Sequence, residues 1–554
     1  MSRDYGLLDR FRRQASEPER SLIDGVLRGT ISRRELFRHG SVLGLSLPLI
    51  SRIGAAAGLA SAASLRTARA APGGVIRVGM SMPSTAIDPV IVPDSNGLAM
   101  LNQTGEFLAI DGPDLVLRPA LATSWSPNKD GSVWTFKIRT GVKFHNGAAL
   151  TAKDVAASIN RLADPANKSN ALSAFTGVLS PGGAKAIDDQ TVEFHLDAPN
   201  GNFPYIVSSD NYNAIILPAD YSGDWEKTFI GTGPFRLEKY TPKVGASFVR
   251  NPDYWGEKAI PDRTEFVFYA DIQPQILALQ GGDVDIIKQA PVLSSLAVLN
   301  DPKFNVISVP SVAHQQLHMR CDQAPFQDKR VRQALALTID RQKLVQGLLR
   351  GRAKIGNDSP FAAIFPSSDP SVPQRKQDLA QARQLLEAAG VGKGFKVTLT
   401  TENWLEIPQY AQLVQSAAKQ VGIEIALKIE EQDAYYGDAV YGKSDWLDSA
   451  MGITDYGHRG VPNVFLAAPL LSDGTWNGAH FKNPQYDGLV KSYVGALDLE
   501  SQRAAAGKIQ RLLLDETPIV FAYFYDYLAV TAKNVTGVEV SAMAQIYLDK
   551  AKKV

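Results

Sequence analysis

Strand patterns and helix patterns are interleaved along this chain from residue 75 onward, and no low-complexity linker separates them. Alternation of apolar and polar side chains predicts strands at 75–80, 134–139 and 191–196, and a further strand is expected at 423–429. Helical spacing of apolar residues predicts helices at 151–162, 378–389, 409–420 and 433–441. Because both kinds of element are mixed and no repeat of solenoid length occurs, the predicted fold class is α/β.

The length of the chain is a second constraint. One hydrophobic core does not serve 554 residues, so two or more lobes are expected. Proline-containing loops occur near Pro310 and at 366–373, but neither has the composition of a flexible tether. Lobes that are joined without a tether imply a chain that crosses between them at a hinge.

Charge separates the first 70 residues from the rest. They hold twelve Arg, no Lys and six Asp or Glu, which is 12 − 6 = +6; because the whole chain carries +1, the remainder carries −5. A mildly acidic body argues against a nucleic-acid partner, which needs a concentrated basic face. Part of the basic excess lies in SRRELFR at 32–38, which resembles the twin-arginine export signature.

A weakly apolar stretch at 41–63 follows this signature, and Ala68-Arg69-Ala70 then supplies the small-x-small pattern of a cleavage site. A membrane anchor is the alternative, but Arg52 lies within the stretch and would cost about 2.5–3.5 kcal/mol in a bilayer. There is no Cys at the cleavage site for a lipid anchor. Residues 1–70 are therefore predicted to be a twin-arginine signal peptide, cleaved after Ala70, and the remaining protein is expected to be free in the periplasm.

Few residues point to catalysis or to a metal. The single cysteine, Cys321, excludes an internal disulfide and a thiolate cluster, and a small buried hydrophobe is the better interpretation of it than a nucleophile. His314 and His318 have the spacing of a metal pair on a helix, yet 309–319 reads as partly extended and offers no acidic third ligand. Without G-x-S-x-G, H-E-x-x-H or a calcium loop, no catalytic residue, metal or cofactor is predicted, although triads assemble from distant residues.

One stretch, GDAVYGKS at 437–444, fits the P-loop expression. A P-loop follows a buried strand directly, whereas here the acidic segment 430–433 intervenes and would repel phosphate. We interpret 433–441 as an amphipathic helix that ends at Gly442.

A series of blocks occurs in a fixed order along the chain. They are LRPALATSW (117–125), DGSVWTFKIR (130–139), GVKFHNG (141–147), LTAKDV (150–155), INR (159–161), GTGPF (231–235), RNPDYWG (250–256), ALQGGDVDI (278–286), PFQDKRVRQA (325–334), IDR (339–341), 382–390 and VGI (421–423). This series resembles the extracellular solute-binding proteins of the dipeptide, oligopeptide and nickel class, which serve ABC importers. The resemblance covers essentially all of the chain after residue 70.

The resemblance implies a two-lobed periplasmic binding protein fold with an enlarged first lobe and a hinge between the lobes. Lobe I with an extra subdomain is expected at 71–312, lobe II at 313–522, and a C-terminal return to lobe I at 523–554. The crossings are expected near 309–314 and 520–525. A monomer is expected to close around a small-molecule ligand by hinge motion and then to dock on the transmembrane subunits of the permease.

In dipeptide-binding members of this class, an Asp in a G-D-P-like loop receives the peptide amine and a basic residue in an earlier loop can receive the carboxylate. In the matching loop at 452–462, Val461 occupies the position where the Asp is expected. The earlier loop, at 401–406, contains no basic residue. Asp455 is a candidate for the amine and Arg459 for a carboxylate, with a surface ion pair as the alternative role of both. The remaining candidates for ligand contact are aromatic residues, for which core packing is the alternative, and the end of the first strand: Trp404, Tyr435, Tyr456 and Ser81.

The ligand is accordingly left open among peptides, opines and modified amino acids, with oligosaccharides or metal chelates as alternatives. Two other functions remain on the same scaffold: a periplasmic hydrolase, and a sensor or chaperone partner.

Overall fold

The computed structural model describes residues 8, 11–13, 15, 17–28, 36, 53 and 73–554. Residues 1–71 and 72–554 form two separate compact units. In the first unit, α2 spans Glu17–Leu27, and the Arg12 guanidinium pairs with the Asp24 carboxylate at 2.9 Å. The predicted export signature at 32–38 (Leu36 apart), the apolar stretch at 41–63 (Ile53 apart) and the cleavage site lie outside the described residues. Among the described helices, none has the length and apolar character needed to span a bilayer.

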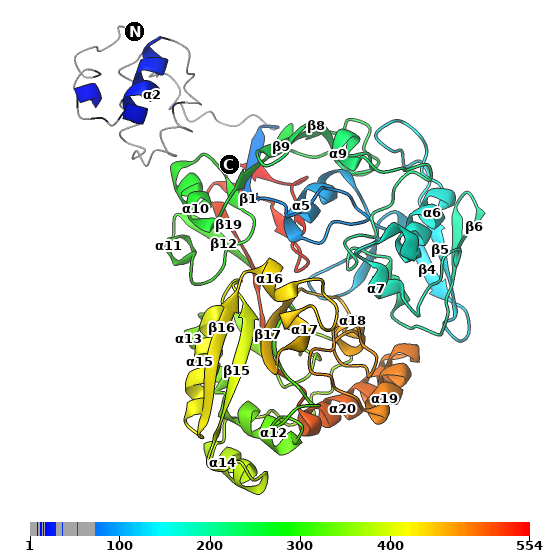
Figure 1. Cartoon of the computed structure of the whole chain (residues 1–554). Coiled ribbons are helices and arrows are strands. Elements are labelled where there is room, and N and C mark those ends of the chain that lie inside the picture. The colour runs from blue at the N-terminus through cyan, green and yellow to red at the C-terminus, as the bar shows by residue number, and fades with distance from the viewer. Residues whose placement is uncertain are drawn as a thin grey trace. The chain divides into compact units, whose positions relative to one another are not determined.

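A seven-stranded sheet organises one half of residues 72–554, in the order β12-β19-β11-β1-β10-β9-β8 (Figure 1). Its strands are β1 (Val75–Ser81), β8 (Phe235–Thr241), β9 (Gly245–Arg250), β10 (Arg263–Tyr269), β11 (Ile286–Ile287), β12 (Phe304–Val309) and β19 (Tyr527–Ala532). β1 is parallel to both of its neighbours, β10 and β11, and the other pairs are antiparallel.

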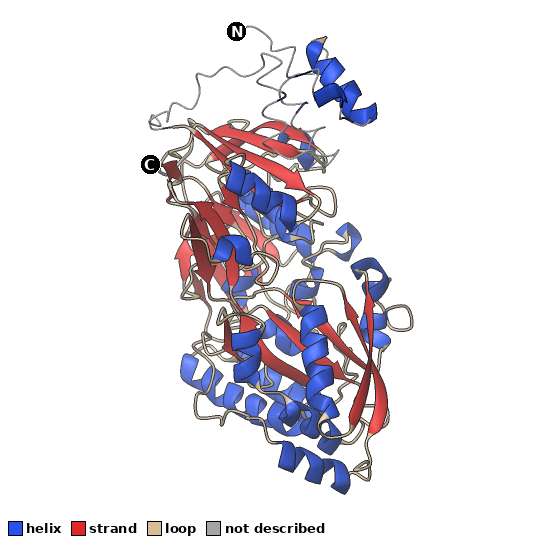
Figure 2. Cartoon of the chain, turned by 90° about the vertical axis from the view of Figure 1, so that its left-hand side faces the viewer, coloured by secondary structure: helices blue, strands red, loops and turns tan. Residues whose placement is uncertain are grey.

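A six-stranded sheet organises the other half, in the order β14-β18-β13-β17-β15-β16. Its strands are β13 (His314–Met319), β14 (Ala353–Ile355), β15 (Phe395–Glu402), β16 (Ile423–Glu430), β17 (Met451–Tyr456) and β18 (Ile519–Tyr525). Along β18, Val520 and Ala522 pack into one core cluster and Ile519 and Phe521 into another, so this sheet is buried on both faces. Figure 2 shows the strands in two groups, with most of the long helices around the lower one.

The first half is enlarged by a subdomain between β1 and β8. Its antiparallel sheet, in the order β4-β5-β7-β6, comprises β4 (Ala122–Pro127), β5 (Val133–Ile138), β6 (Ala184–Asp188) and β7 (Thr191–His195). The helix α6 (Ala152–Ala163) packs on β6 and β7. The predicted α/β fold with two lobes and an enlarged first lobe is therefore confirmed.

Helices and short strands complete the unit. The helices are α5 (Ser95–Thr104), α7 (Leu172–Phe175), α8 (Phe203–Ile206), α9 (Trp225–Thr228), α10 (Ile272–Gly281), α11 (Leu296–Leu299), α12 (Lys329–Thr338), α13 (Arg341–Gly347), α14 (Leu379–Ala388), α15 (Ile407–Lys419), α16 (Gln432–Tyr436), α17 (Asp445–Asp448), α18 (Asn463–Ala467), α19 (Pro484–Gly495) and α20 (Leu499–Glu516), with a 3-10 turn at Pro165–Asn167. The short strands pair as β2 (Ala109–Asp111) with β3 (Leu117–Pro119), β20 (Val535–Thr536) with β23 (Lys552–Lys553), and β21 (Glu539–Val540) with β22 (Ile546–Tyr547).

The chain passes between the two large sheets twice, from β12 to β13 and from β18 to β19. The two connections lie side by side: the Ser311 hydroxyl donates to the Tyr525 carbonyl (2.5 Å), and the Tyr525 N–H donates to the Ala313 carbonyl (2.9 Å). A pair of adjacent crossings is the construction of a hinge. The boundaries expected at residues 312 and 522 stay a prediction.

Local signals located most elements well. The strands expected at 75–80, 134–139, 191–196 and 423–429 correspond to β1, β5, β7 and β16. The helix expected at 151–162 corresponds to α6, which a four-residue capping box opens at Thr151. Asp378 caps α14 by accepting from the Gln381 N–H, and Gly390 takes a φ of 78° after its end.

The helix expected at 433–441 is a correction. The helix α16 ends at Tyr436, because Gly437 turns the chain with a φ of 52°, five residues before the expected stop. A turn follows, in which the Asp438 N–H donates to the Lys443 carbonyl (3.2 Å). The P-loop-like stretch therefore lies in the connection from α16 to α17 and does not follow a strand.

Candidate ligand-binding cleft

The carboxyl ends of parallel strands carry several of the predicted ligand-binding residues. β15 is parallel to β16 and β17, and the pairing of Thr401 with Ile453 places the ends of β15 and β17 side by side. Trp404 follows β15 and Asp455 lies at the end of β17, while Ser81 ends β1 in the first sheet. Open α/β sheets bind their ligands at this edge. Figure 1 places α16, which follows β16, at the end of the second sheet that faces the first sheet.

Two carboxylates lie next to each other at the end of the second sheet. The buried Glu402 accepts hydrogen bonds from the Asp455 N–H (3.0 Å) and the Tyr436 hydroxyl (2.8 Å). Its other oxygen accepts from the Gln432 amide (2.6 Å). Asp455 stays partly exposed and accepts from the Tyr525 hydroxyl (2.8 Å). Within the described part of the chain, no Lys or Arg forms an ion pair with either carboxylate.

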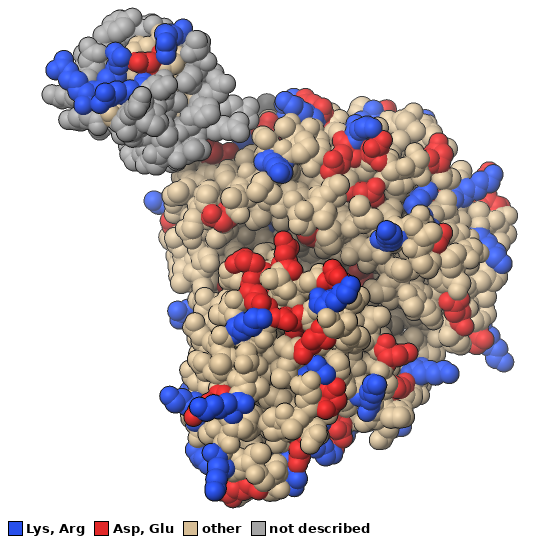
Figure 3. Space-filling model, viewed as in Figure 1, with Lys and Arg blue, Asp and Glu red and all other residues tan. Residues whose placement is uncertain are grey.

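The carboxyl groups of Glu402 and Asp455 have no neighbouring basic side chain to offset their negative charge in the described part of the chain. Burial raises the pKa of Glu402, and burial together with the neighbouring Glu402 charge raises the pKa of Asp455 to about 8. A cation placed beside Asp455 would favour the ionised carboxylate and reverse the shift. Figure 3 shows further acidic side chains in the middle of this face, around the position of α16; the acids of that segment are Glu430, Glu431, Asp433 and Asp438.

A third acid, Glu406, connects the two halves. It precedes α15 in the second half, is buried, and accepts the Leu293 N–H (3.1 Å) from the segment that follows β11 of the first sheet. Burial raises the pKa of its carboxyl group. Glu406 thus adds negative charge near Asp455 while its own oxygen is occupied by the backbone.

The remaining candidates differ in exposure. The Trp404 side chain is 37% exposed and precedes Leu405, whose φ of 45° is unusual for a residue with a side chain. The Ser81 hydroxyl accepts from the Gln275 amide at 3.3 Å. Trp404 is therefore available to stack on a ligand, whereas Ser81 already has a partner.

Tyr435 and Tyr456 lie in the core of the second half. Tyr435 is 0% exposed and its hydroxyl shares a hydrogen bond with that of Thr454 (2.7 Å). Tyr456 stacks on His314 with ring centroids 5.6 Å apart and an interplanar angle of 4°. Both tyrosines belong to one core cluster, so this placement favours packing, and their role as ligand contacts stays a prediction.

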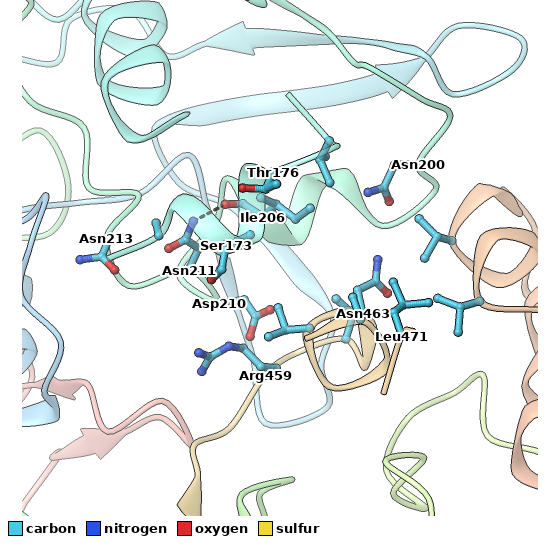
Figure 4. Close-up of a pocket in the computed structure, with 18 of the residues that line it drawn as sticks. Ser173, Thr176, Asn200, Ile206, Asp210, Asn211, Asn213, Arg459, Asn463 and Leu471 are labelled. Atoms are coloured by element: carbon cyan, nitrogen blue, oxygen red, sulfur yellow. Dashed lines mark hydrogen bonds between the residues drawn. The ribbon is translucent and has the colours of Figure 1, made fainter. Parts of the chain in front are cut away.

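Arg459, in the loop after β17, lines a cavity of about 290 Å³ between the subdomain and the second half (Figure 4). The walls come from 170–178 and 200–213 on one side and from 459–494 on the other. The guanidinium donates to the His458 carbonyl (2.7 Å) and lies over the Tyr212 ring (5.9 Å to the centroid). The other five predicted residues do not line this cavity.

The cavity has an apolar lining with amides around it. Its apolar residues include Ile206, Val461, Val464, Leu471 and Val490, and its amides are Asn170, Asn200, Asn211, Asn213 and Asn463. Its two sides are joined by hydrogen bonds from the Gly201 N–H to the Val494 carbonyl (2.9 Å) and from the Asn202 amide to Asn463 (2.9 Å). Such a lining suits an apolar group of a ligand.

Sequence reasoning missed one cluster altogether. Asp111, Asp210 and His458 are buried, and one ligand-type atom of each lies within 4.8 Å of the others. However, the Val312 N–H donates to His458 Nδ1 (3.1 Å), so the proton of the neutral ring is on Nε2. A metal bound at Nε2 would require the opposite tautomer, and the arrangement is therefore poorly suited to a metal.

Cys321 and the histidine pair have structural surroundings. Burial raises the pKa of the Cys321 thiol to about 11, which keeps it protonated and a poor nucleophile. His314 and His318 are buried in β13 and do not share a helix. Burial lowers the pKa of each imidazole to about 4.

Residues 116–472 match the family described as bacterial extracellular solute-binding proteins, family 5. The chain is 26% identical over 499 residues to the dipeptide-binding protein DppE of Bacillus subtilis, covering 84% of this chain and 89% of that protein. It is 27% identical over 456 residues to the periplasmic murein peptide-binding protein MppA of Escherichia coli, covering 77% and 82%.

Solved structures agree in fold. The ABC transporter-associated periplasmic binding protein DppA of Helicobacter pylori, in complex with the peptide STSA, has a TM-score of 0.72 at 24% identity and covers 86% of this chain and 99% of its own. The substrate-binding protein CtaP of Listeria monocytogenes has a TM-score of 0.78 at 22% identity, covering 87% and 100%. The match over residues 116–472, with the two sheets and the enlarged first lobe, shows that the chain belongs to family 5 of the bacterial extracellular solute-binding proteins.

Proposed function

We propose that this chain is the periplasmic solute-capturing component of an ABC importer and that its ligand is a small peptide or peptide-like molecule with a free amino group. The observation that carries the proposal is the Asp455–Glu402 pair, two adjacent acids at the ligand-binding edge without a basic partner among the described residues. Relatives named for dipeptides and for murein peptides support the same ligand class.

The ammonium group is assigned to Asp455. The residue is partly exposed, and its carboxylate accepts a hydrogen bond from the Tyr525 hydroxyl, which holds one oxygen in place. An ammonium group donates up to three charge-assisted hydrogen bonds and would supply the positive charge that this pair lacks.

The carboxylate is assigned to Arg459, and a side chain of the ligand to the adjoining cavity. Arg459 forms no ion pair with an acid in the described part of the chain, and it is one of the residues that line the apolar cavity. Its planar guanidinium can accept a carboxylate through two parallel hydrogen bonds. Trp404 adds an exposed aromatic face in the segment that follows β15.

Export and delivery complete the proposal. The SRRELFR segment at 32–38 and the Ala68-Arg69-Ala70 site support export by the twin-arginine machinery and cleavage after Ala70. The protein then acts as a monomer that delivers its ligand to the permease without chemical change, since capture by lobe closure needs no covalent step.

A binding screen tests the proposal. Titration calorimetry would compare short peptides with the same peptides acetylated at the amino terminus, and with opines, oligosaccharides and nickel chelates. Free-amine peptides are expected to bind and their acetylated forms to bind about 10- to 100-fold more weakly, the range of a lost charge-assisted hydrogen bond. Recovery of the bound peptide intact is expected. Equal affinity for both forms would contradict the amine assignment, and cleaved peptide would favour a hydrolase.

A further inference from the structure

Three polar side chains from distant parts of the sequence meet where the first half touches the loop after β17. Asp111 ends β2, Asp210 follows α8, and His458 lies in the 457–461 loop that also carries Arg459. Their exposed fractions are 7%, 6% and 3%, so all three are removed from bulk water. Buried polar groups of this kind are costly unless they are paired, and their pairing therefore matters to the conformation that buries them.

Hydrogen bonds join the 457–461 loop to the first half and to the crossing segment between the halves. The Gly460 N–H donates to the Asp210 carboxylate, which belongs to the first half. His458 Nδ1 accepts the N–H of Val312, in the crossing from β12 to β13. The Asp210 bond therefore spans the two halves, and it cannot persist if they separate by hinge motion.

The carboxylate of this bond has a second carboxylate beside it. Asp111 accepts from the Ser209 hydroxyl, and in the described residues neither Asp111 nor Asp210 forms an ion pair. The titratable and charged groups that face the pair come from the turn between β2 and β3, from β3, α8, the 457–461 loop and β22. They are Asp114, Arg118, Tyr205, His458, Arg459 and Tyr547. Arg459 offsets part of the negative charge, but its guanidinium hydrogen bonds to the His458 carbonyl.

The carboxyl groups of Asp111 and Asp210 have oxygen atoms within 4.8 Å of each other, and two buried carboxyl groups this close hold one proton between them. Burial and the neighbouring Asp111 charge raise the pKa of Asp210 to about 8, while burial and Arg459 lower the pKa of His458 to about 3. His458 thus stays neutral, and the proton that titrates is the one on the carboxyl pair.

We propose that Asp210 is a positioning residue that latches the 457–461 loop, and with it Arg459, to the first lobe, and that the latch holds while the Asp111–Asp210 pair keeps one proton. Loss of this proton places two negative charges in a buried site and favours separation of the lobes, in which both carboxylates reach water. The inference rests on the proposed function only in treating Arg459 as a ligand residue.

The direction with pH follows from linkage. At pH values between the ordinary pKa of an Asp and about 8, the latched form binds one proton more than the open form. The ratio of closed to open protein is therefore greatest at low pH and falls by up to about tenfold per pH unit as the pH rises towards 8. A ligand that binds the closed form is then held more weakly at higher pH.

The test measures lobe closure without any ligand. Spin labels at Lys185→Cys, on the exposed side of β6, and Lys508→Cys, on α20, would report the distance between the halves in the full chain carrying Cys321→Ser. Distance distributions would be recorded from pH 5.5 to 8.5 for the wild-type sequence, Asp210→Asn and Asp210→Ala. Asp220→Asn, at an exposed Asp of the same half, is the matched control.

In the parent protein and the Asp220→Asn control, the closed population is expected to fall as the pH rises. Asp210→Asn keeps an acceptor for the Gly460 N–H and removes one of the two carboxyl groups, so its closed population should change less with pH than that of the parent. Asp210→Ala should be more open at every pH while retaining a cooperative thermal transition. A parent profile that is flat, or an Asp210→Asn profile that follows the parent, would overturn the proposal whether or not peptides bind. Failure of peptides to bind, with these profiles as expected, would count against the proposed ligand only.

Discussion

At the scale of single residues, the candidate cleft is governed by carboxyl groups whose protonation depends on their surroundings. Asp455 and Asp210 both lie beside a second acid, and burial raises the pKa of each to about 8. They differ in what can offset their negative charge. Asp455 is partly exposed and can be neutralised by a ligand cation, whereas Asp210 is buried and accepts a backbone N–H. As the pH rises towards 8, the contribution of Asp455 to ligand affinity therefore increases, whereas the contribution of the Asp210 latch decreases.

Proton release on binding is the prediction that belongs to Asp455. Below pH 8 its carboxyl group holds a proton that an ammonium ligand must displace. In the Asp210→Asn variant, in which the opposing pH dependence of the latch is weakened, the affinity for a free-amine peptide should therefore rise from pH 6 towards 8. Above about 8 the peptide amine itself loses its proton, and the affinity should fall. Calorimetry of Asp210→Asn at pH 7 in buffers of different ionisation enthalpy should show proton release on binding, and the parent protein should release less, because closing its latch takes up a proton.

Variants separate this effect from the latch. In the Asp210→Asn background, the further change Asp455→Asn should weaken peptide binding about 10- to 100-fold and abolish the proton release, because the titrating group is gone. Asp433→Asn, which removes an exposed acid of the neighbouring α16, should behave as the parent protein. Undiminished proton release in Asp455→Asn would show that another group receives the amine.

At the scale of elements, the site is assembled where β15, α16 and β17 end together. Local signals located β16 and the helices α14 and α15, because alternation, helical spacing and capping residues act over a few positions. They placed the end of α16 wrongly, since two glycines offered a stop and only the packed chain selects Gly437. Glu402 was overlooked for a related reason: nothing in 401–406 indicates that its carboxylate will accept three hydrogen bonds from two other segments, α16 and β17.

Removing the charge of Glu402 is the prediction at this scale. Because the Glu402 carboxylate helps to raise the pKa of Asp455, Glu402→Gln should lower that pKa and move the rise of peptide affinity to lower pH. Tyr436→Phe, which removes one hydrogen bond to Glu402 but leaves its charge, is the control and should keep the pH profile of the parent. An unchanged profile in Glu402→Gln would mean that Glu402 is already neutral in the free protein.

At the scale of the whole molecule, the ordered blocks along the sequence were sufficient for the two-lobed fold but not for the contacts between the lobes. Asp111, Asp210 and His458 are separated by about one hundred residues or more, and no local pattern relates them; only the packing of the subdomain against the second half brings them together. The blocks specify the scaffold common to the family, whereas the contacts between lobes depend on residues outside them.

Residues 72–554 form a compact unit of their own, so they are expected to fold without residues 1–70. Three large core clusters lie within this unit, so it contains the apolar burial that a stable fold requires. A protein that lacks residues 1–70 should therefore unfold cooperatively with a Tm within about 2 °C of the full chain, less than the shift produced by 1 kcal/mol in a domain of 150–250 residues. At a peptide concentration of 100 times Kd, both forms should gain about 2.7 kcal/mol of apparent stability, because ligand binds only the folded unit. Differential scanning calorimetry of both forms, with and without peptide, makes the comparison. A truncated protein that unfolds gradually, or that binds peptide less tightly than the full chain, would show that residues 1–70 are part of the functional fold.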